Sequence, residues 1–181
     1  RRDLLFEVYL PAAGPMIHEM GDAAGIPVVT VIGPEAEIAA AITENGRVGV
    51  LATPATVASG AYRDALDAAG RPLTVTEVSA PDLAPLIQVD LSFDDELIDA
   101  VRGYSAPLKD AGVDTLILGC THYPLIAPAI QRILGRDVRL VTAGHAIAGA
   151  IQRQLASTGS LSERTGEGDY RFLVTGDVDS F

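Results

Sequence analysis

The sequence predicts an α/β protein built on mainly parallel sheets with flanking helices. From residue 26 onward, short runs rich in Val, Ile and Leu alternate with longer Ala-rich segments of helical period. This alternation is typical of consecutive βα units, whose parallel strands are covered by helices. Of the 181 residues, 48% are hydrophobic, which is enough apolar surface to build a folded core.

The elements can be assigned in chain order. The strands are expected at 27–32, 47–52, 73–78, 114–119, 138–142 and 171–175. The helices are expected at 34–44, 57–69, 93–111, 123–134 and 143–156. Pro34 and Pro124 fall in expected first turns, where the missing N–H of proline costs no hydrogen bond. The polar, Gly- and Ser-rich segment 157–170 is expected to be a surface loop or a hinge.

Residues 1–25 fit this pattern less well. Leu4 to Leu10 is compatible with a strand, and Gly14 and Pro15 are compatible with the start of a helix that runs to Ala24. No segment precedes this strand to complete a βαβ unit, and the sequence has no initiator Met. We therefore expect an incomplete first sheet and a fragment of a longer chain.

Composition argues against several classes of partner. The net charge of −11 provides no basic surface for nucleic acid or for an anionic membrane. No apolar run approaches the roughly 20 residues that a membrane-spanning helix needs. One cysteine excludes an internal disulfide, and with three scattered histidines it forms no structural zinc motif. We expect a cytoplasmic protein with no metal, nucleic-acid or membrane partner.

The segment 116–125, Leu-Ile-Leu-Gly-Cys-Thr-His-Tyr-Pro-Leu, is the part of the sequence most suggestive of chemistry. It places Cys120, Thr121 and His122 where a buried strand passes into a helix, at the sheet edge where α/β proteins bind ligands. Free N–H groups and the dipole of the following helix would lower the thiol pKa and could hold a carboxylate. Cys120 and His122 are therefore candidate catalytic residues, and Thr121 and His122 are candidate substrate-binding residues.

Each of these residues also has a structural interpretation. A lone cysteine after an apolar strand is commonly a small buried hydrophobe, and His122 could cap a helix or pack. His18 and His145 have no such neighbours and are expected to be surface or structural residues.

A second polar turn follows the expected strand 47–52. One interpretation is that Thr53 caps the next helix and Ser59 is exposed. The other is that Thr53 and Thr56, with nearby backbone amides, bind an anionic group of a substrate. Neither turn is a Gly-rich nucleotide loop, since the sequence contains no such motif.

The turn at 119–125, Gly-Cys-Thr-His-Tyr-Pro-Leu, resembles the second-cysteine motif of bacterial glutamate racemases, which belong to the aspartate/glutamate racemase superfamily. Further segments resemble the same family in the same order, and the resemblance covers about residues 15–181. These segments are 26–32, 45–51, 53–62 and 171–177.

The resemblance implies cofactor-independent interconversion of L- and D-glutamate for peptidoglycan synthesis. In this family two cysteines lie on opposite faces of the substrate α-carbon, and one removes the α-proton while the other protonates the far face. By resemblance, Cys120 is one of that pair, Thr121 and His122 bind or assist, and Thr53 lines the site.

The resemblance also implies two pseudo-symmetric flavodoxin-like domains, the first of them incomplete. Residues 34–142 would form the second domain, which carries the Cys-Thr-His motif, and 1–33 with 143–181 would form the remnant of the first. A homodimer is compatible with this arrangement.

The sequence departs from the family at its start. The first-cysteine motif, Cys-Asn-Thr-Ala, should lie just before Pro15, where this chain has Tyr9, Leu10 and Pro11 instead. The family's Asp-Ser-Gly turn has no counterpart, and Gln88 replaces a usual glutamate. Truncation, a shifted reading frame and a decayed copy each account for this. We expect impaired racemisation; the alternatives are a non-catalytic dicarboxylate-binding or partner-binding remnant, or an aspartate or hydantoin racemase.

Overall fold

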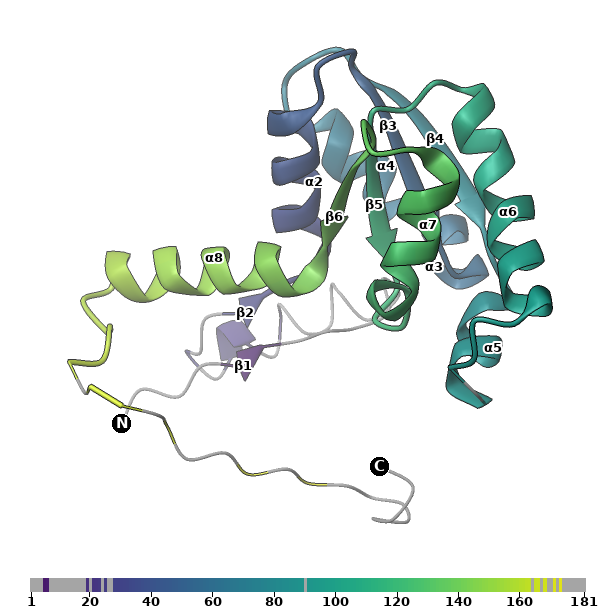
Figure 1. Ribbon diagram of the computed structural model, residues 1–181. Coiled ribbons are helices and arrows are strands. Elements are labelled where there is room, and N and C mark those ends of the chain that lie inside the picture. Colours follow the sequence, from purple (N-terminus) through teal and green to yellow (C-terminus); the bar gives the residue numbers. More distant parts are fainter. Residues whose placement is uncertain are drawn as a thin grey trace.

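A computed structural model shows a four-stranded parallel sheet with helices on both faces, which confirms the predicted fold class (Figure 1). The strand order is β4-β3-β5-β6, with β3 (Arg47–Ala52), β4 (Thr74–Ser79), β5 (Thr115–Gly119) and β6 (Arg139–Thr142). The structure describes residues 5–6, 19, 21–23, 25, 28–89, 91–163, 165–166, 168, 171 and 173.

The helices pack in two groups. Figure 1 shows α2 and α4 on one face of the sheet and α6 and α7 on the other. The helices in chain order are α2 (Ile32–Ile42), α3 (Pro54–Ser59), α4 (Ala61–Asp67), α5 (Leu83–Val89), α6 (Asp95–Asp110), α7 (Ala127–Leu134) and α8 (Ala143–Ser157). A four-residue 3₁₀ helix, η2 (Tyr123–Ile126), precedes α7.

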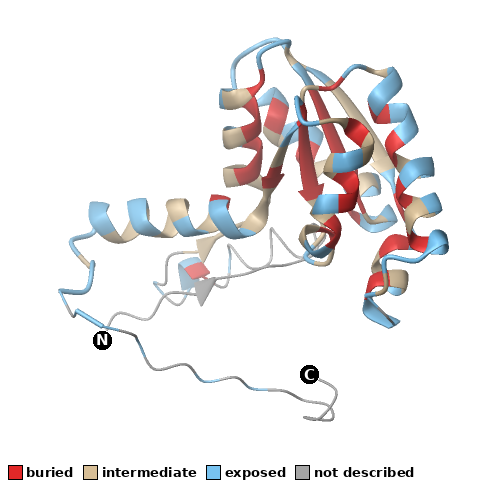
Figure 2. Cartoon of the chain, in the orientation of Figure 1, coloured by how far each residue is buried: buried red, intermediate tan, exposed pale blue. Residues whose placement is uncertain are grey.

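The two central strands are buried on both faces (Figure 2). Successive side chains of a strand point to opposite faces, so each strand contributes to two separate cores. Val50 and Ile117 pack with α2 and α4, whereas Leu51 and Leu116 pack with α5, α6 and α7. This double burial explains why the sequence of β3 and β5 is almost continuously apolar.

A second, two-stranded parallel sheet pairs β1 (Leu5–Phe6) with β2 (Val28–Val29), and β2 contacts α8. Residues 19 and 21–23 are helical, as expected for the helix that ends near Ala24. Most of the strand expected at 171–175 lies outside the described residues, and Arg171 and Leu173 belong to no helix or strand. The division into two pseudo-symmetric domains stays a prediction.

Three predicted helices differ from the observed ones. The helix expected at 57–69 is divided at Gly60, whose φ of 68° lies in the left-handed region that favours glycine. The helix expected at 93–111 begins at Asp95, because the Asp94 carboxylate caps it by accepting from the Leu97 amide at 2.9 Å. The third expected helix, at 123–134, begins as the 3₁₀ helix η2.

The expectations for two other elements also need correction. The strand expected at 27–32 is shorter, because α2 already begins at Ile32, two residues before the predicted start. Helix α5 was not predicted. Pro85 lies in the first turn of α5, where proline is tolerated.

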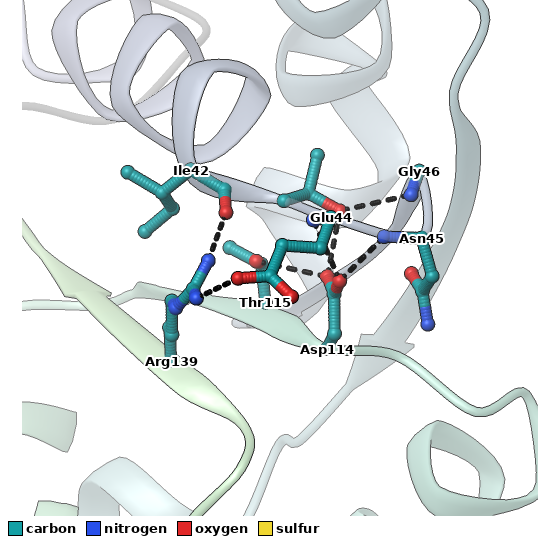
Figure 3. Close-up of polar contacts among 8 residues, drawn as sticks. Ile42, Glu44, Asn45, Gly46, Asp114, Thr115 and Arg139 are labelled. Atoms are coloured by element: carbon teal, nitrogen blue, oxygen red, sulfur yellow. Dashed lines mark hydrogen bonds and ion pairs between the residues drawn. The ribbon is translucent and has the colours of Figure 1, made fainter.

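Asp114 joins the loop between α2 and β3 to the amino edge of the sheet (Figure 3). Its carboxylate accepts hydrogen bonds from the Thr43 hydroxyl at 2.6 Å and from the amides of Glu44 and Asn45 at 2.8 and 2.7 Å. The Thr115 hydroxyl adds a fourth bond at 3.0 Å. Burial alone would raise the pKa of Asp114, but these bonds together hold the pKa below its ordinary value.

Candidate active site

Two polar turns lie side by side at the carboxyl edge of the sheet. Strands β3 and β5 are parallel neighbours, and their last paired residues are Ala52 and Gly119. Thr53 and Cys120 are therefore the first residues beyond adjacent strand ends. The register thus brings together the two turns that were singled out separately in the sequence.

The Cys120 turn contains a thiol and an imidazole in contact. Cys120 Sγ lies 3.8 Å from His122 Nδ1, and Thr121 Oγ1 lies 3.4 Å from the same nitrogen. Cys120 and His122 are half-buried, and Thr121 is exposed. Both contacts are long, so the imidazole is near enough to exchange a proton with the thiol without being fixed by a short hydrogen bond.

Tyr123, the residue after His122, fixes this turn to the core of the protein. Its side chain is fully buried, and its hydroxyl donates to the Ala80 carbonyl at 2.9 Å. The Ala80 amide in turn donates to the Ala52 carbonyl at 2.9 Å, which links the ends of β3, β4 and β5. Burial, followed by the nearby charges of Cys120 and Tyr104, raises the pKa of Tyr123, so this phenol stays protonated and acts as a support.

The expected helix dipole at Cys120 needs correction. The element that follows Cys120 is the four-residue helix η2, and the α-helix proper begins only at Ala127. The Tyr123 amide donates to the Cys120 carbonyl at 3.2 Å, and the Leu125 amide donates to the His122 carbonyl at 3.0 Å. These two amides are therefore already used within the turn, and the α-helical amides lie further along the chain.

The second turn presents a pair of hydroxyls. Thr53 occupies the N-cap position of α3, but its side chain makes no capping hydrogen bond. Thr53 Oγ1 instead lies 3.0 Å from Oγ1 of Thr56, which is only 7% exposed. Ser59 is exposed, as predicted, and its hydroxyl donates to the Thr56 carbonyl at 2.7 Å. The side-chain capping interpretation is thus wrong, and a hydroxyl pair lies next to the Cys120 turn.

The other residues considered in the sequence do not join this site. Gln88 is exposed on α5, and His145 is exposed on α8, as expected for a surface residue. Tyr9 and His18 lie outside the described residues. Within the described part of the chain, no group of three His, Cys, Asp or Glu side chains could hold a metal ion. No helix described by the structure combines the length and apolarity needed to cross a bilayer.

Sequence reasoning missed a buried carboxyl group near this edge. Glu35 lies in the first turn of α2 and is fully buried, and the Tyr62 hydroxyl donates to its Oε2 at 2.5 Å. A signal was present, since Glu35 shares the helix face of Ala36 and Ala39, which are also buried. An acidic residue on the buried face of an Ala-rich helix indicates an unusual polar site.

Together these features define a parallel α/β protein with a thiol, an imidazole and two hydroxyls at the ligand-binding edge of its sheet. A family model described as Asp/Glu/Hydantoin racemase matches residues 11–151. The chain belongs to this family.

Known relatives cover almost all of the chain. It is 37% identical to the glutamate racemase of Acidothermus cellulolyticus, over 94% of this chain and 65% of that protein. It is 42% identical to the glutamate racemase of Beutenbergia cavernae, over 87% of this chain and 56% of that protein. The crystal structure of glutamate racemase isoform RacE1 from Bacillus anthracis superposes with a TM-score of 0.90 at 33% identity, covering 98% of this chain and 66% of that one. The chain thus spans less than two thirds of the length of the first two relatives.

Proposed function

We propose that the chain carries one acid/base half of a cofactor-independent amino-acid racemase that acts on glutamate. The observation that carries the proposal is the Cys120–His122 pair, which lies at the carboxyl edge next to the Thr53–Thr56 hydroxyls. The family membership and the two relatives that are glutamate racemases support the choice of reaction and substrate. In this proposal, the parent racemase works in the cytoplasm and supplies D-glutamate for peptidoglycan synthesis.

The proposed chemistry is proton transfer at the substrate α-carbon. The Cys120 thiolate takes the α-proton and leaves a carbanion, or the thiol returns a proton to it, depending on the enantiomer. His122 lies near enough to accept the thiol proton and so generate the thiolate. The hydroxyls of Thr121, Thr53 and Thr56 would donate to the substrate carboxylates.

Inversion needs a second proton-transfer group on the opposite face of the α-carbon. Cys120 is the one cysteine in these 181 residues, so this chain supplies a single thiol. We therefore infer that it racemises glutamate weakly or not at all, while still exchanging the α-proton of one enantiomer with solvent.

The test is proton exchange of purified chain with L- and D-glutamate in deuterated water, followed by NMR, with circular dichroism reporting racemisation. We expect exchange of one enantiomer, a flat dichroism trace and loss of exchange in Cys120→Ser. His122→Asn should slow exchange, whereas His145→Asn, which changes an exposed histidine on α8, should not. Full racemisation, or exchange that persists without the thiol, would contradict the proposal.

A second candidate is a non-catalytic dicarboxylate-binding or partner-binding domain. It is favoured by the Thr53–Thr56 hydroxyl pair, which is intact in a chain that has a single thiol. Calorimetry with glutamate and aspartate tests dicarboxylate binding: heat without proton exchange would favour this candidate, and the absence of heat with both ligands would count against it. An aspartate or hydantoin racemase is the remaining alternative within the family, and the same exchange assay with those substrates separates it.

A further inference from the structure

Exposed apolar side chains gather where α5 ends and α6 begins. Among the described residues, six large hydrophobic side chains are exposed, and three of the six, Val89, Leu91 and Phe93, lie between residues 89 and 93. Val89, the last residue of α5, is 87% exposed. Single exposed apolar residues are normal on a protein surface, whereas a cluster of them marks a site of interaction.

The cluster borders a groove between α5 and the first turn of α6, two helices that contact each other (Figure 1). Ser92, the neighbour of both Leu91 and Phe93, lines this α5–α6 groove. The apolar lining residues are Pro85, Leu86 and Val89 of α5 and Leu97 of α6. The groove has a volume of about 240 Å³. Small-molecule pockets usually exceed about 300 Å³, so a groove of this size is better suited to one or two side chains of another protein.

The rim of the groove is acidic, because Asp94 and Glu96 also line it. Hydrogen bonds from the Leu97 amide and then from the Ser92 hydroxyl hold the pKa of Asp94 below its ordinary value, so this carboxyl group is charged at neutral pH. Glu96 is exposed, and no hydrogen bond or ion pair with another described residue engages its side chain. The rim therefore presents negative charge beside apolar surface.

The chain supplies no nearby cation that neutralises this rim. Residues 72–101 contain no Lys, Arg or His. Arg102, the next cation along α6, pairs with Asp99. Acidic residues in a first turn also suit the helix dipole, so the rim alone would need no ligand. Its combination with an apolar groove and exposed hydrophobic side chains is what indicates a partner.

We propose that the α5–α6 groove docks a segment of a partner protein in which Lys or Arg flanks a large apolar side chain. The apolar side chain enters the groove beside Val89, and the cation pairs with Glu96 at the rim. A second copy of this chain is poorly suited, because each copy has a net charge of −11 and a symmetric contact would bring two acidic rims together. The inference goes beyond the proposed function and does not depend on it, since no residue of the groove belongs to the Cys120 site.

Fluorescence anisotropy of three labelled peptides with the purified chain tests the proposal. The first, Gly-Lys-Leu-Arg-Phe-Gly, combines cations with apolar side chains and should bind with a Kd below about 1 mM. The second, Gly-Lys-Gly-Arg-Gly-Gly, keeps only the cations, and the third, Gly-Glu-Leu-Glu-Phe-Gly, reverses the charge. Both should bind at least about tenfold more weakly, and added salt should weaken binding of the first peptide.

Two exposed residues of the groove are changed to locate the site. Val89→Ser should weaken the first peptide about tenfold, because an apolar contact is lost. Its matched control is Leu161→Ser, which makes the same kind of change on an exposed residue after α8. Glu96→Gln should weaken binding about fivefold, whereas Asp110→Asn, which removes a charge from the last residue of α6, should not. Far-ultraviolet circular dichroism reports folding of each variant.

The proposal is overturned if the first peptide binds more weakly than about 1 mM, or if the acidic peptide binds equally well. Equal losses in Val89→Ser and Leu161→Ser would show attraction to the whole acidic surface and would overturn it too. Analytical ultracentrifugation checks the other occupant: self-association of the chain that Val89→Ser abolishes would assign the groove to a second copy. The proton-exchange assay of the proposed function is separate, and it should give the same result for Val89→Ser as for the unmodified chain.

Discussion

Two carboxyl groups at opposite edges of the sheet differ in how the fold treats their charge. Asp114, at the amino edge, accepts four hydrogen bonds, and these lower its pKa despite partial burial. Glu35, near the carboxyl edge, accepts one hydrogen bond from Tyr62, and burial raises its pKa to about 7. The fold therefore stabilises the charged form of Asp114 and the neutral form of Glu35.

Helix α2 connects these two environments. Its first turn carries Glu35, and Thr43 at its C-cap donates to Asp114. At the amino edge, the end of the helix is bonded to a carboxylate whose pKa lies below its ordinary value. The other end of the same helix carries a buried carboxyl group that changes its charge around neutral pH.

The largest expected effect is a pH dependence of stability that Glu35 imposes. An acid whose folded pKa is raised stabilises the fold fully below its ordinary pKa of 4.5, and this contribution is lost as pH rises to about 7. From pH 4.5 to 7, Glu35→Gln should gain on the order of 3 kcal/mol relative to the unmodified chain. Urea unfolding at pH 5 and pH 8 measures this change, and an equal difference at both pH values would contradict it.

Asp114 should show the opposite pH dependence. Asp114→Ala removes the acceptor of four hydrogen bonds and should cost about 2 kcal/mol at pH 7. An acid with a lowered pKa stabilises the fold above its ordinary value of 3.8, and the contribution is lost as pH falls through the folded pKa. The stability difference should therefore shrink in urea unfolding below pH 3.8. A difference that grew in acid would contradict this assignment.

The sequence predicted the strands of the sheet well and the helix boundaries less well. All four strands of the main sheet were predicted within about one residue, because each is a short segment rich in Val, Ile, Leu or Thr and bounded by turn residues. The predicted helix boundaries were wrong where a single residue interrupts the helical pattern of the sequence. Gly60, for example, divides α3 from α4.

The candidate site was predictable only in part, for a similar reason. Cys120 and Thr53 each follow an apolar strand, so both turns could be placed at the carboxyl edge from the sequence. The pairing of Glu35 with Tyr62 joins residues 27 positions apart through helix packing, which no local pattern predicts. The sequence offered Thr53 and Thr56 as a pair of binding hydroxyls beside a capping interpretation of Thr53, and it could not show that the two hydroxyls lie 3.0 Å apart.

Gly119→Ala tests whether the Tyr62 ring supports the Cys120 turn. The new methyl group would lie 2.8 Å from Tyr62 Cε2 and 3.1 Å from Ala52 Cβ, so the ring must move at a cost of about 1–3 kcal/mol. Gly144→Ala on α8 is the control, because no atom lies within 4 Å of its added methyl group. Thermal unfolding should show a loss for Gly119→Ala and little change for Gly144→Ala. Equal stability of the two variants would mean that the ring does not press on this strand end.

The smallest expected effect concerns the hydroxyl pair. Thr53→Val removes one hydroxyl at nearly constant volume and leaves Thr56 Oγ1 without the neighbour that lies 3.0 Å away. If Thr53 donates to a substrate carboxylate, the KM for α-proton exchange should rise about fivefold, equivalent to about 1 kcal/mol for one hydrogen bond. Ser59→Ala is the control, because it also removes a hydroxyl from α3, but one that is exposed and donates to the Thr56 carbonyl. An unchanged KM with reduced stability would assign the hydroxyl pair to the fold, as Asp114 is at the opposite edge.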